Sequence, residues 1–239
     1  MTSCSGRIDG GATWSDAGWD GALPEDNVTS YYIDPDAPDV VYAGHSIGGV
    51  YKSEDGGTTW AESNQDLAGV IPYALAVAPD DPDTLYAYTT RGLLKSQNGG
   101  RAWQSLEKWV GGRQGERMVA VDPITATRVY LGKPCEDAFC LWISADAGAN
   151  WREVTTALPA DRSGYSTSVE VIAPHPAQPG LILAGVTFFP PGEDTAADGG
   201  IYISEDHGEH WAFLAATLPF EQVADIVYDA VDPYLIYAG

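Results

Sequence analysis

Carboxylates beside glycines and a tryptophan form the first pattern in this chain that could do chemistry. The stretch SEDGGTTW, residues 53–60, holds two neighbouring acids, Glu54 and Asp55. It is compatible with a metal loop, a catalytic acid pair or a tight turn. The twelve-residue calcium-loop pattern with its closing Glu is absent, which argues against a calcium site.

The same pattern recurs, and the recurrence favours the turn. Further copies read SQNGGRAW at 96–103, SADAGANW at 144–151, SEDHGEHW at 204–211 and RIDGGATW at 7–14. A catalytic site is seldom needed in every repeat of a chain, whereas a structural turn is. We therefore predict hairpin turns in which the Asp accepts hydrogen bonds from backbone N–H groups and the glycines supply unusual backbone angles. We expect the Trp to pack between neighbouring sheets.

We call these stretches box turns. Their predicted structural residues are Asp9, Trp14, Ser53, Asp55, Trp60, Ser96, Trp103, Ser144, Asp146, Trp151, Ser204, Asp206 and Trp211. Two copies depart from the pattern, because Arg7 replaces the Ser of the first and Asn98 replaces the Asp of the third. We expect those two turns to be less well braced.

A second phrase alternates with the box turns. It reads IDPDAPDVVYAG at 33–44 and VAPDDPDTLYAY at 77–88, and it returns at 121–132, 172–185 and 228–239. Each repeat of about 40 to 50 residues then offers four short β-prone runs separated by turn residues, without a long helical period. The sequence predicts an all-β chain, a β-propeller with four-stranded antiparallel blades.

The repeats also predict how the chain is organised. We expect a single domain over 1–239 with five blades, closed into a ring by pairing of the N-terminal strand, residues 3–7, with the C-terminal strand YLIYAG. Closure leaves no open sheet edge and predicts a monomer. The alternatives are a fragment of a larger propeller and an engineered or excised repeat protein.

Candidate binding residues lie in the loops opposite the box turns. Trp19 stands beside Asp20, and Trp109 stands near Arg113 and Arg117. An aromatic face with directional polar groups suits a glycan, peptide or protein ligand. The alternative is that both tryptophans pack on neighbouring blades and the charges are solvated.

The predicted inner strands add one carboxylate. Aligning the repeats on the second phrase places Glu170 in a column with Tyr31, Leu75, Val119 and Ile226. Glu170 could line the central channel near Arg117 and Asp225 as a ligand-binding residue, or form a salt bridge that closes the channel. Asp20, Glu170 and Asp225 are the candidate acids if the chain is catalytic.

The cysteines indicate a cellular compartment, and the net charge excludes some classes of partner. Cys135 and Cys140 flank a short loop, which permits a disulfide and would imply an oxidising compartment; two free thiols are the alternative. Cys4 is expected to be a buried apolar residue. With 34 acidic and 12 basic residues the net charge is −22, which argues against nucleic acid and anionic membranes.

No further ligand class is indicated. We predict neither a metal nor a cofactor. We find no signal peptide, because residues 1–11 are polar, and no apolar run long enough to span a membrane. A mature extracellular or periplasmic protein is expected, and a cytoplasmic location stays open.

The box turns together with the second phrase resemble the BNR or Asp-box repeat proteins. That group includes sialidases, the sortilin ectodomain, xyloglucanases and photosystem II assembly-factor propellers; the last three are the most similar. The resemblance implies a propeller whose box turns lie at the blade periphery, away from the site. Sialidases need three convergent arginines and xyloglucanases need two carboxylates in a cleft between two domains. We therefore expect a non-catalytic binding or scaffold propeller, with a glycoside hydrolase as the alternative.

Overall fold

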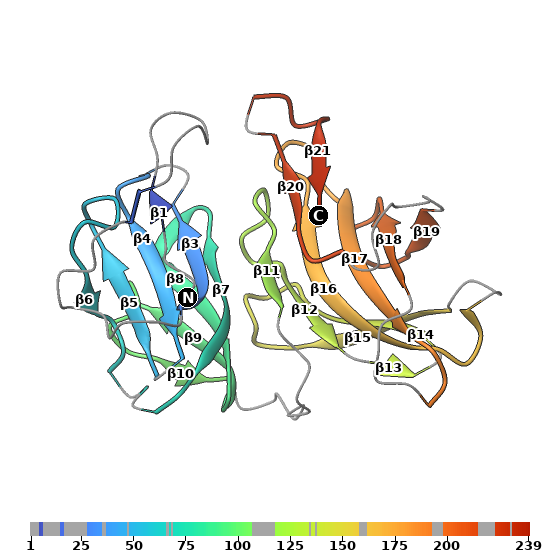
Figure 1. The fold of residues 1–239 in the computed structure, drawn as a ribbon, viewed down its shortest axis with the longest axis horizontal. Helices are drawn as coiled ribbons and strands as arrows, with labels where there is room; N and C mark the ends of the chain where they lie inside the picture. Colours follow the sequence, from blue (N-terminus) through green and yellow to red (C-terminus); the bar gives the residue numbers. More distant parts are fainter. Residues whose placement is uncertain are drawn as a thin grey trace. The chain divides into compact units, whose positions relative to one another are not determined.

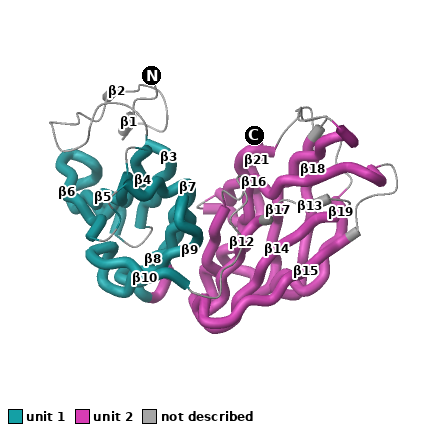
Figure 2. The backbone as a smooth tube through the Cα atoms, turned by 90° about the horizontal axis from the view of Figure 1, so that it is seen from below, with its two compact units in different colours: residues 1–77, 81–109 teal, residues 78–80, 110–239 magenta. Residues whose placement is uncertain are grey.

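The computed structural model contains β-strands joined by turns and loops (Figure 1). It describes residues 5–6, 15–16, 28–34, 37–46, 48–65, 67, 69–106, 118–133, 135–136, 138–157, 162–192, 198–214, 223–229 and 231–239. Of these, residues 5, 6, 15, 16, 133, 135, 136, 157 and 198 are described by their backbone alone. The chain divides into two compact units, residues 1–77 with 81–109 and residues 78–80 with 110–239 (Figure 2).

Two four-stranded antiparallel sheets, which we call blades A and B, belong to the first unit. Blade A contains β3 (Val28–Ile33), β4 (Val41–His45), β5 (Val50–Ser53) and β6 (Ala61–Glu62). Blade B contains β7 (Pro72–Ala78), β8 (Asp81–Thr89), β9 (Gly92–Gln97) and β10 (Gln104–Ser105). In both blades the strands lie side by side in chain order.

The second unit holds blades C and D. Blade C contains β11 (Val119–Val121), β12 (Val129–Lys133), β14 (Ala138–Ser144) and β15 (Arg152–Ala157). Blade D contains β16 (Ser166–Pro174), β17 (Ile182–Phe189), β18 (Asp198–Ser204) and β19 (Ala212–Leu214). A fifth strand, β13 (Cys135–Glu136), joins blade D beside β16. The all-β class and the four-stranded antiparallel blades are confirmed.

The predicted count of five blades is wrong for the described strands, which form four complete blades. Among the described residues, each terminal segment supplies one pair of strands. β1 (Ser5–Gly6) pairs with β2 (Ser15–Asp16), and β20 (Ile226–Tyr228) pairs with β21 (Ile236–Ala238). The predicted pairing between the two terminal segments is not among the described strand pairs, so ring closure is not shown. A single domain over 1–239 stays a prediction.

Apolar side chains pack between consecutive blades of each unit. In the first unit, Trp103 of blade B is buried against Tyr42 and Val50 of blade A. In the second unit, Trp211 of blade D packs with Phe139 and Ile143 of blade C. Burial of large aromatics at these junctions stabilises the stacking of one sheet on the next.

A glycine in the second strand allows this close stacking. A Cβ at Gly132 would lie 2.8 Å from the Cβ of Val169 in the next blade. A Cβ at Gly185 would lie 2.7 Å from Val223, and one at Gly44 would lie 2.8 Å from Pro72. The glycine that closes the second repeated phrase is therefore explained by the approach of the following inner strand.

The four described box turns join the third strand of each blade to the fourth. In the turn 53–60, Ser53 Oγ accepts the N–H of Gly57 at 2.8 Å and donates to Asp55 Oδ1 at 2.8 Å. The Asp55 carboxylate accepts the N–H of Thr59 at 2.7 Å, and Trp60 Nε1 donates to the Gly57 carbonyl at 2.9 Å. The same bonds recur in the turns 144–151 and 204–211.

The turn 96–103 differs from this pattern. Asn98 Oδ1 still accepts from Ser96 Oγ and from the N–H of Ala102. Ala102 has no hydroxyl, however, so this turn lacks the bond that Thr59 Oγ1 donates to Asp55 Oδ2 in blade A. Trp103 Nε1 donates instead to the carbonyl of Ser63 in blade A.

The turns between first and second strands lie next to the box turns. Gly56 N–H donates to the Asp39 carbonyl at 2.9 Å, and the equivalent bond occurs in blades B, C and D. In blade C, Asp122 Oδ1 accepts the N–H groups of Ile124 and Thr125. In blade D, His175 Nδ1 takes this role and accepts the N–H groups of residues 177 and 178.

Candidate functional site

Five of the predicted ligand-binding residues lie outside the described residues: Trp19, Asp20, Trp109, Arg113 and Arg117. Cys4 and the box turn 7–14, with Asp9 and Trp14, also lie outside them. The structure does describe the carboxylates Glu170 and Asp225.

Glu170 lies in β16, the first of the four blade D strands in chain order, and is half-buried. The ladder with β17 shifts register between Val169 and Val171, so Glu170 sits in a β-bulge. In blade A the equivalent shift falls between Val28 and Ser30. Glu170 therefore corresponds to Thr29, and the predicted alignment of Glu170 with Tyr31 is wrong.

Asp225 comes from the neighbouring strand pair. It is exposed just before β20, and its Oδ1 accepts the N–H of Ile226 at 2.9 Å. Val223 and Ile226 form a buried cluster with Val171 of β16. The two carboxylates thus flank one apolar junction, and a β-bulge at such a position re-aims a side chain.

The loop flanked by Cys135 and Cys140 contains part of a strand, β13. This strand pairs with β16 of the next blade, with Cys135 opposite Thr167 and Glu136 opposite Ser166. Thr167 Oγ1 also donates to the Ala138 carbonyl at 2.6 Å. Cys140 is disulfide-bonded; its pairing with Cys135 stays a prediction, because the Cys135 side chain is not described.

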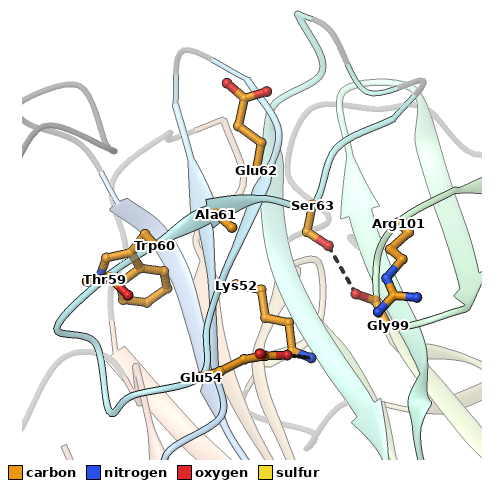
Figure 3. Close-up of a pocket in the computed structure, with 9 residues that line it drawn as sticks. All are labelled: Lys52, Glu54, Thr59, Trp60, Ala61, Glu62, Ser63, Gly99 and Arg101. Atoms are coloured by element: carbon orange, nitrogen blue, oxygen red, sulfur yellow. Dashed lines mark hydrogen bonds and ion pairs between the residues drawn. The ribbon is translucent and has the colours of Figure 1, made fainter.

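A groove lies between the box turns of blades A and B (Figure 3). Its volume is about 310 Å³, and its lining residues come from β5, from both turns and from residues 61–63. They are Lys52, Glu54, Thr59, Trp60, Ala61, Glu62, Ser63, Gly99 and Arg101. Trp60 lies at one end in Figure 3 and Arg101 at the other, and Ser63 Oγ donates to the Gly99 carbonyl at 3.0 Å.

Charge in this groove is mixed. Lys52 Nζ donates to Glu54 Oε1 at 2.8 Å and lies 5.7 Å from the centre of the Tyr42 ring. This hydrogen bond lowers the pKa of Glu54, and the positive charge of the lysine lowers it further. Burial alone would lower the pKa of Lys52, yet its interactions with Glu54 and Tyr42 raise it. Both groups are therefore ionised near neutral pH.

The groove between blades C and D occupies the same place in the repeat. Its volume is about 240 Å³, and Trp151, Arg152 and Glu209 are among its lining residues. Arg152 Nη2 lies 2.6 Å from Glu209 Oε2, so an ion pair crosses this groove. Asp146 in the same wall accepts hydrogen bonds within its turn, and those from Asn150 are the main cause of its lowered pKa.

Sequence reasoning treated these turns as structural and did not consider the grooves beside them. The signal was present in the repeat: the sixth position of the box reads Thr58, Arg101, Ala149 and Glu209 in the four described turns. No group of three or more His, Cys, Asp or Glu residues that could hold a metal occurs in the part of the chain that the structure describes.

The chain is similar in sequence to known xyloglucanases. It is 27% identical over 219 residues to an oligoxyloglucan reducing-end-specific xyloglucanase from Emericella nidulans, which covers 84% of this chain and 25% of the relative. It is 33% identical over 141 residues to a xyloglucanase from Paenibacillus, which covers 49% of this chain and 13% of the relative. The chain thus spans a quarter or less of the length of these curated relatives. No family model matches.

Among solved structures, the GH74 xyloglucanase from Xanthomonas campestris superposes with a TM-score of 0.63 at 19% identity, over 87% of this chain and 34% of that one. The fold is a β-propeller. At this identity the likeness shows the fold alone.

These matches overturn the expectation of a non-catalytic binding or scaffold propeller. The curated relatives are named xyloglucanases, so the similarity favours the alternative of a glycoside hydrolase. The expectation failed because it treated the small number of arginines and the single predicted domain as arguments against catalysis, although neither excludes a carboxylate pair.

Proposed function

We propose that this chain is a propeller module of a glycoside hydrolase that acts on xyloglucan or a related β-glucan. The similarity to the Emericella xyloglucanase carries the proposal, because it extends over 84% of this chain. The recurring box-turn geometry supports, in addition, a place among the Asp-box repeat proteins. Export from the cytoplasm is part of the proposal, since Cys140 is disulfide-bonded and disulfides persist in oxidising compartments. The described part of the chain has no helix long and apolar enough to cross a membrane.

Hydrolysis of a glycosidic bond needs two carboxyl groups, one that protonates the leaving oxygen and one that acts as base or nucleophile. Glu170 and Asp225 are our candidates, with Asp20 as a third. The bulge in β16 supports Glu170, because the register shift singles out its side chain among apolar neighbours.

The test is release of new reducing ends from xyloglucan by the purified chain. We expect turnover by the wild type and a loss of roughly 100-fold or more in Glu170→Gln or Asp225→Asn. Thermal unfolding of each variant checks that the fold is retained. Failure of the wild-type chain to release reducing ends above the buffer rate overturns the proposal.

A further inference from the structure

The groove between the box turns of blades A and B has an exposed guanidinium. The charge of Arg101 contributes to the lowered pKa of Glu54, but no hydrogen bond or ion pair joins its guanidinium to another residue that the structure describes. Glu62 is exposed on the same strand as Ala61, and in Figure 3 its carboxylate points away from the Lys52–Glu54 pair. Donors and acceptors are therefore offered at separate points along one groove.

In the equivalent groove of blades C and D an ion pair joins the two walls. Arg152 follows Trp151 in the chain, as Ala61 follows Trp60. Glu209 holds the sixth box position, as Arg101 does in blade B. The ion pair at 2.6 Å between Arg152 and Glu209 has no counterpart between blades A and B, because Ala61 has no charge to offer Arg101.

The acidic and basic side chains of this groove together favour a neutral ligand. Glu54 and Glu62 disfavour an anion, and Arg101 with Lys52 disfavours a cation. A neutral polyhydroxylated chain can accept from the guanidinium and donate to the carboxylates. The half-buried indole of Trp60, whose N–H is held by the Gly57 carbonyl, adds a fixed apolar wall. The volume of about 310 Å³ is at the lower end for ligand pockets.

We propose that this groove is a second, non-catalytic glycan site that holds a neutral glucan chain on the outer edge of blades A and B. The inference extends the proposed function, because it assigns the same ligand class to a surface without the candidate acids. It is tested by binding alone, so it can fail while hydrolysis stands, and it can stand while hydrolysis fails.

The experiment is a titration of cellotetraose into the whole chain. Calorimetry measures the affinity, and the NMR signals of the indole N–H groups report which tryptophans are affected. The Trp60→Phe variant assigns the Trp60 signal. We expect that signal to shift on binding, and Arg101→Ala to weaken binding roughly tenfold by loss of charged hydrogen bonds. The double variant Ala61→Arg, Arg101→Glu copies the ion pair of the other groove and should weaken binding at least as much.

Matched controls come from the other groove. Arg152→Ala and Glu209→Ala should leave the affinity unchanged, and thermal unfolding of every variant reports whether the fold is kept. Three results overturn the proposal: no binding of cellotetraose by the wild type, wild-type affinity in Arg101→Ala, or binding that leaves the Trp60 signal unmoved. An affinity that falls equally in the control variants also overturns it.

Discussion

Trp103 donates its indole N–H to the carbonyl of Ser63, 3.1 Å away in the preceding blade. In the other described box turns the indole N–H bonds within its own turn, as Trp60 does with Gly57. Ser63 also donates its hydroxyl to Gly99, so two hydrogen bonds link this residue to the turn of blade B. The junction of blades A and B thus combines apolar packing with directional bonds.

Trp103→Phe should therefore destabilise the first unit. The change removes a buried hydrogen bond and leaves the Ser63 carbonyl without the indole donor, which costs about 1 to 3 kcal/mol. Trp60→Phe is the control, since it removes a bond within one half-buried turn and should cost less. Urea unfolding gives both values, and equal costs would contradict the role assigned to the inter-blade bond.

Ala147→Gly should stabilise the chain. Ala147 has φ of +56° in its box turn, where blades A and B have glycine at the equivalent positions. An L-residue in this conformation costs about 1 kcal/mol, so we expect a gain of that order in the free energy of unfolding. Gly56→Ala is the reverse change: a Cβ there would meet nothing closer than 3.7 Å, which leaves backbone strain as the cause of its expected loss. A destabilised Ala147→Gly variant would refute this explanation.

Gly132→Ala should be destabilising through steric overlap. The new Cβ would lie 2.8 Å from the Cβ of Val169 in the next blade, and overpacking of this kind costs about 1 to 3 kcal/mol. Gly239→Ala provides the comparison, because a Cβ at that position meets nothing within 4 Å. Denaturant unfolding of the two variants should differ clearly, and similar curves would show that blade D does not press on Gly132.

The box turn of blade D should lose stability in acid. Burial alone would raise the pKa of Asp206, but hydrogen bonds from the His210 N–H and ring, and from Ser204, lower it to about 2. The ordinary value is 3.8. A carboxyl with a lowered pKa in the folded state contributes stability above its ordinary pKa and loses that contribution as pH falls toward 2.

Asp206→Asn should reduce the loss of stability between pH 4 and pH 2, because the amide cannot be protonated in this range. Asn98 already holds the equivalent position in blade B, so the substitution is compatible with the turn. Melting temperatures of both proteins from pH 7 to pH 2 test the prediction. Parallel curves below pH 4 would assign the acid sensitivity to other carboxylates.

His175 should be replaceable by Asp but not by Phe. Its Nδ1 accepts two backbone N–H groups at 3.0 and 2.9 Å, as the carboxylate of Asp122 does in blade C. Phe keeps an aromatic ring against Tyr228 but leaves both donors unpaired, at a cost of about 1 kcal/mol or more. Asp keeps the acceptor and loses the ring contact. Unfolding of both variants separates the two contributions, and a harmless His175→Phe change would dismiss the hydrogen-bonding role.

The strand class and the turns could be predicted because their causes are local. Each box turn is built from bonds among Ser53, Asp55, Thr59 and their equivalents, within a few residues of one another. The predicted alignment of Glu170 with Tyr31 was wrong because it matched Pro174 to Pro35. In the structure the His175 N–H donates to the Leu181 carbonyl, as the Asp34 N–H donates to the Val40 carbonyl. His175 therefore corresponds to Asp34, and the alignment of this repeat shifts by two residues.

Two features could not be predicted from the repeat, the course of β13 and the groove of blades A and B, because both depend on contacts between repeats. The course of β13 into the next blade has no counterpart among the described residues of the other repeats, so periodicity does not predict it. The groove of blades A and B is lined by residues from two repeats, among them Ala61 and Arg101, so no single repeat reveals it. The function was misjudged because a fold with many uses does not select an activity.

The strand β13 also bears on the ancestry of the chain. Repeat proteins are built from units that contact their neighbours, so a unit can in principle be copied or lost whole. Loss of blade D would leave the strand from blade C without the edge of β16 on which it lies. We therefore expect blades C and D to be copied or lost together, whereas the boundary between blades A and B carries no such strand among the residues described.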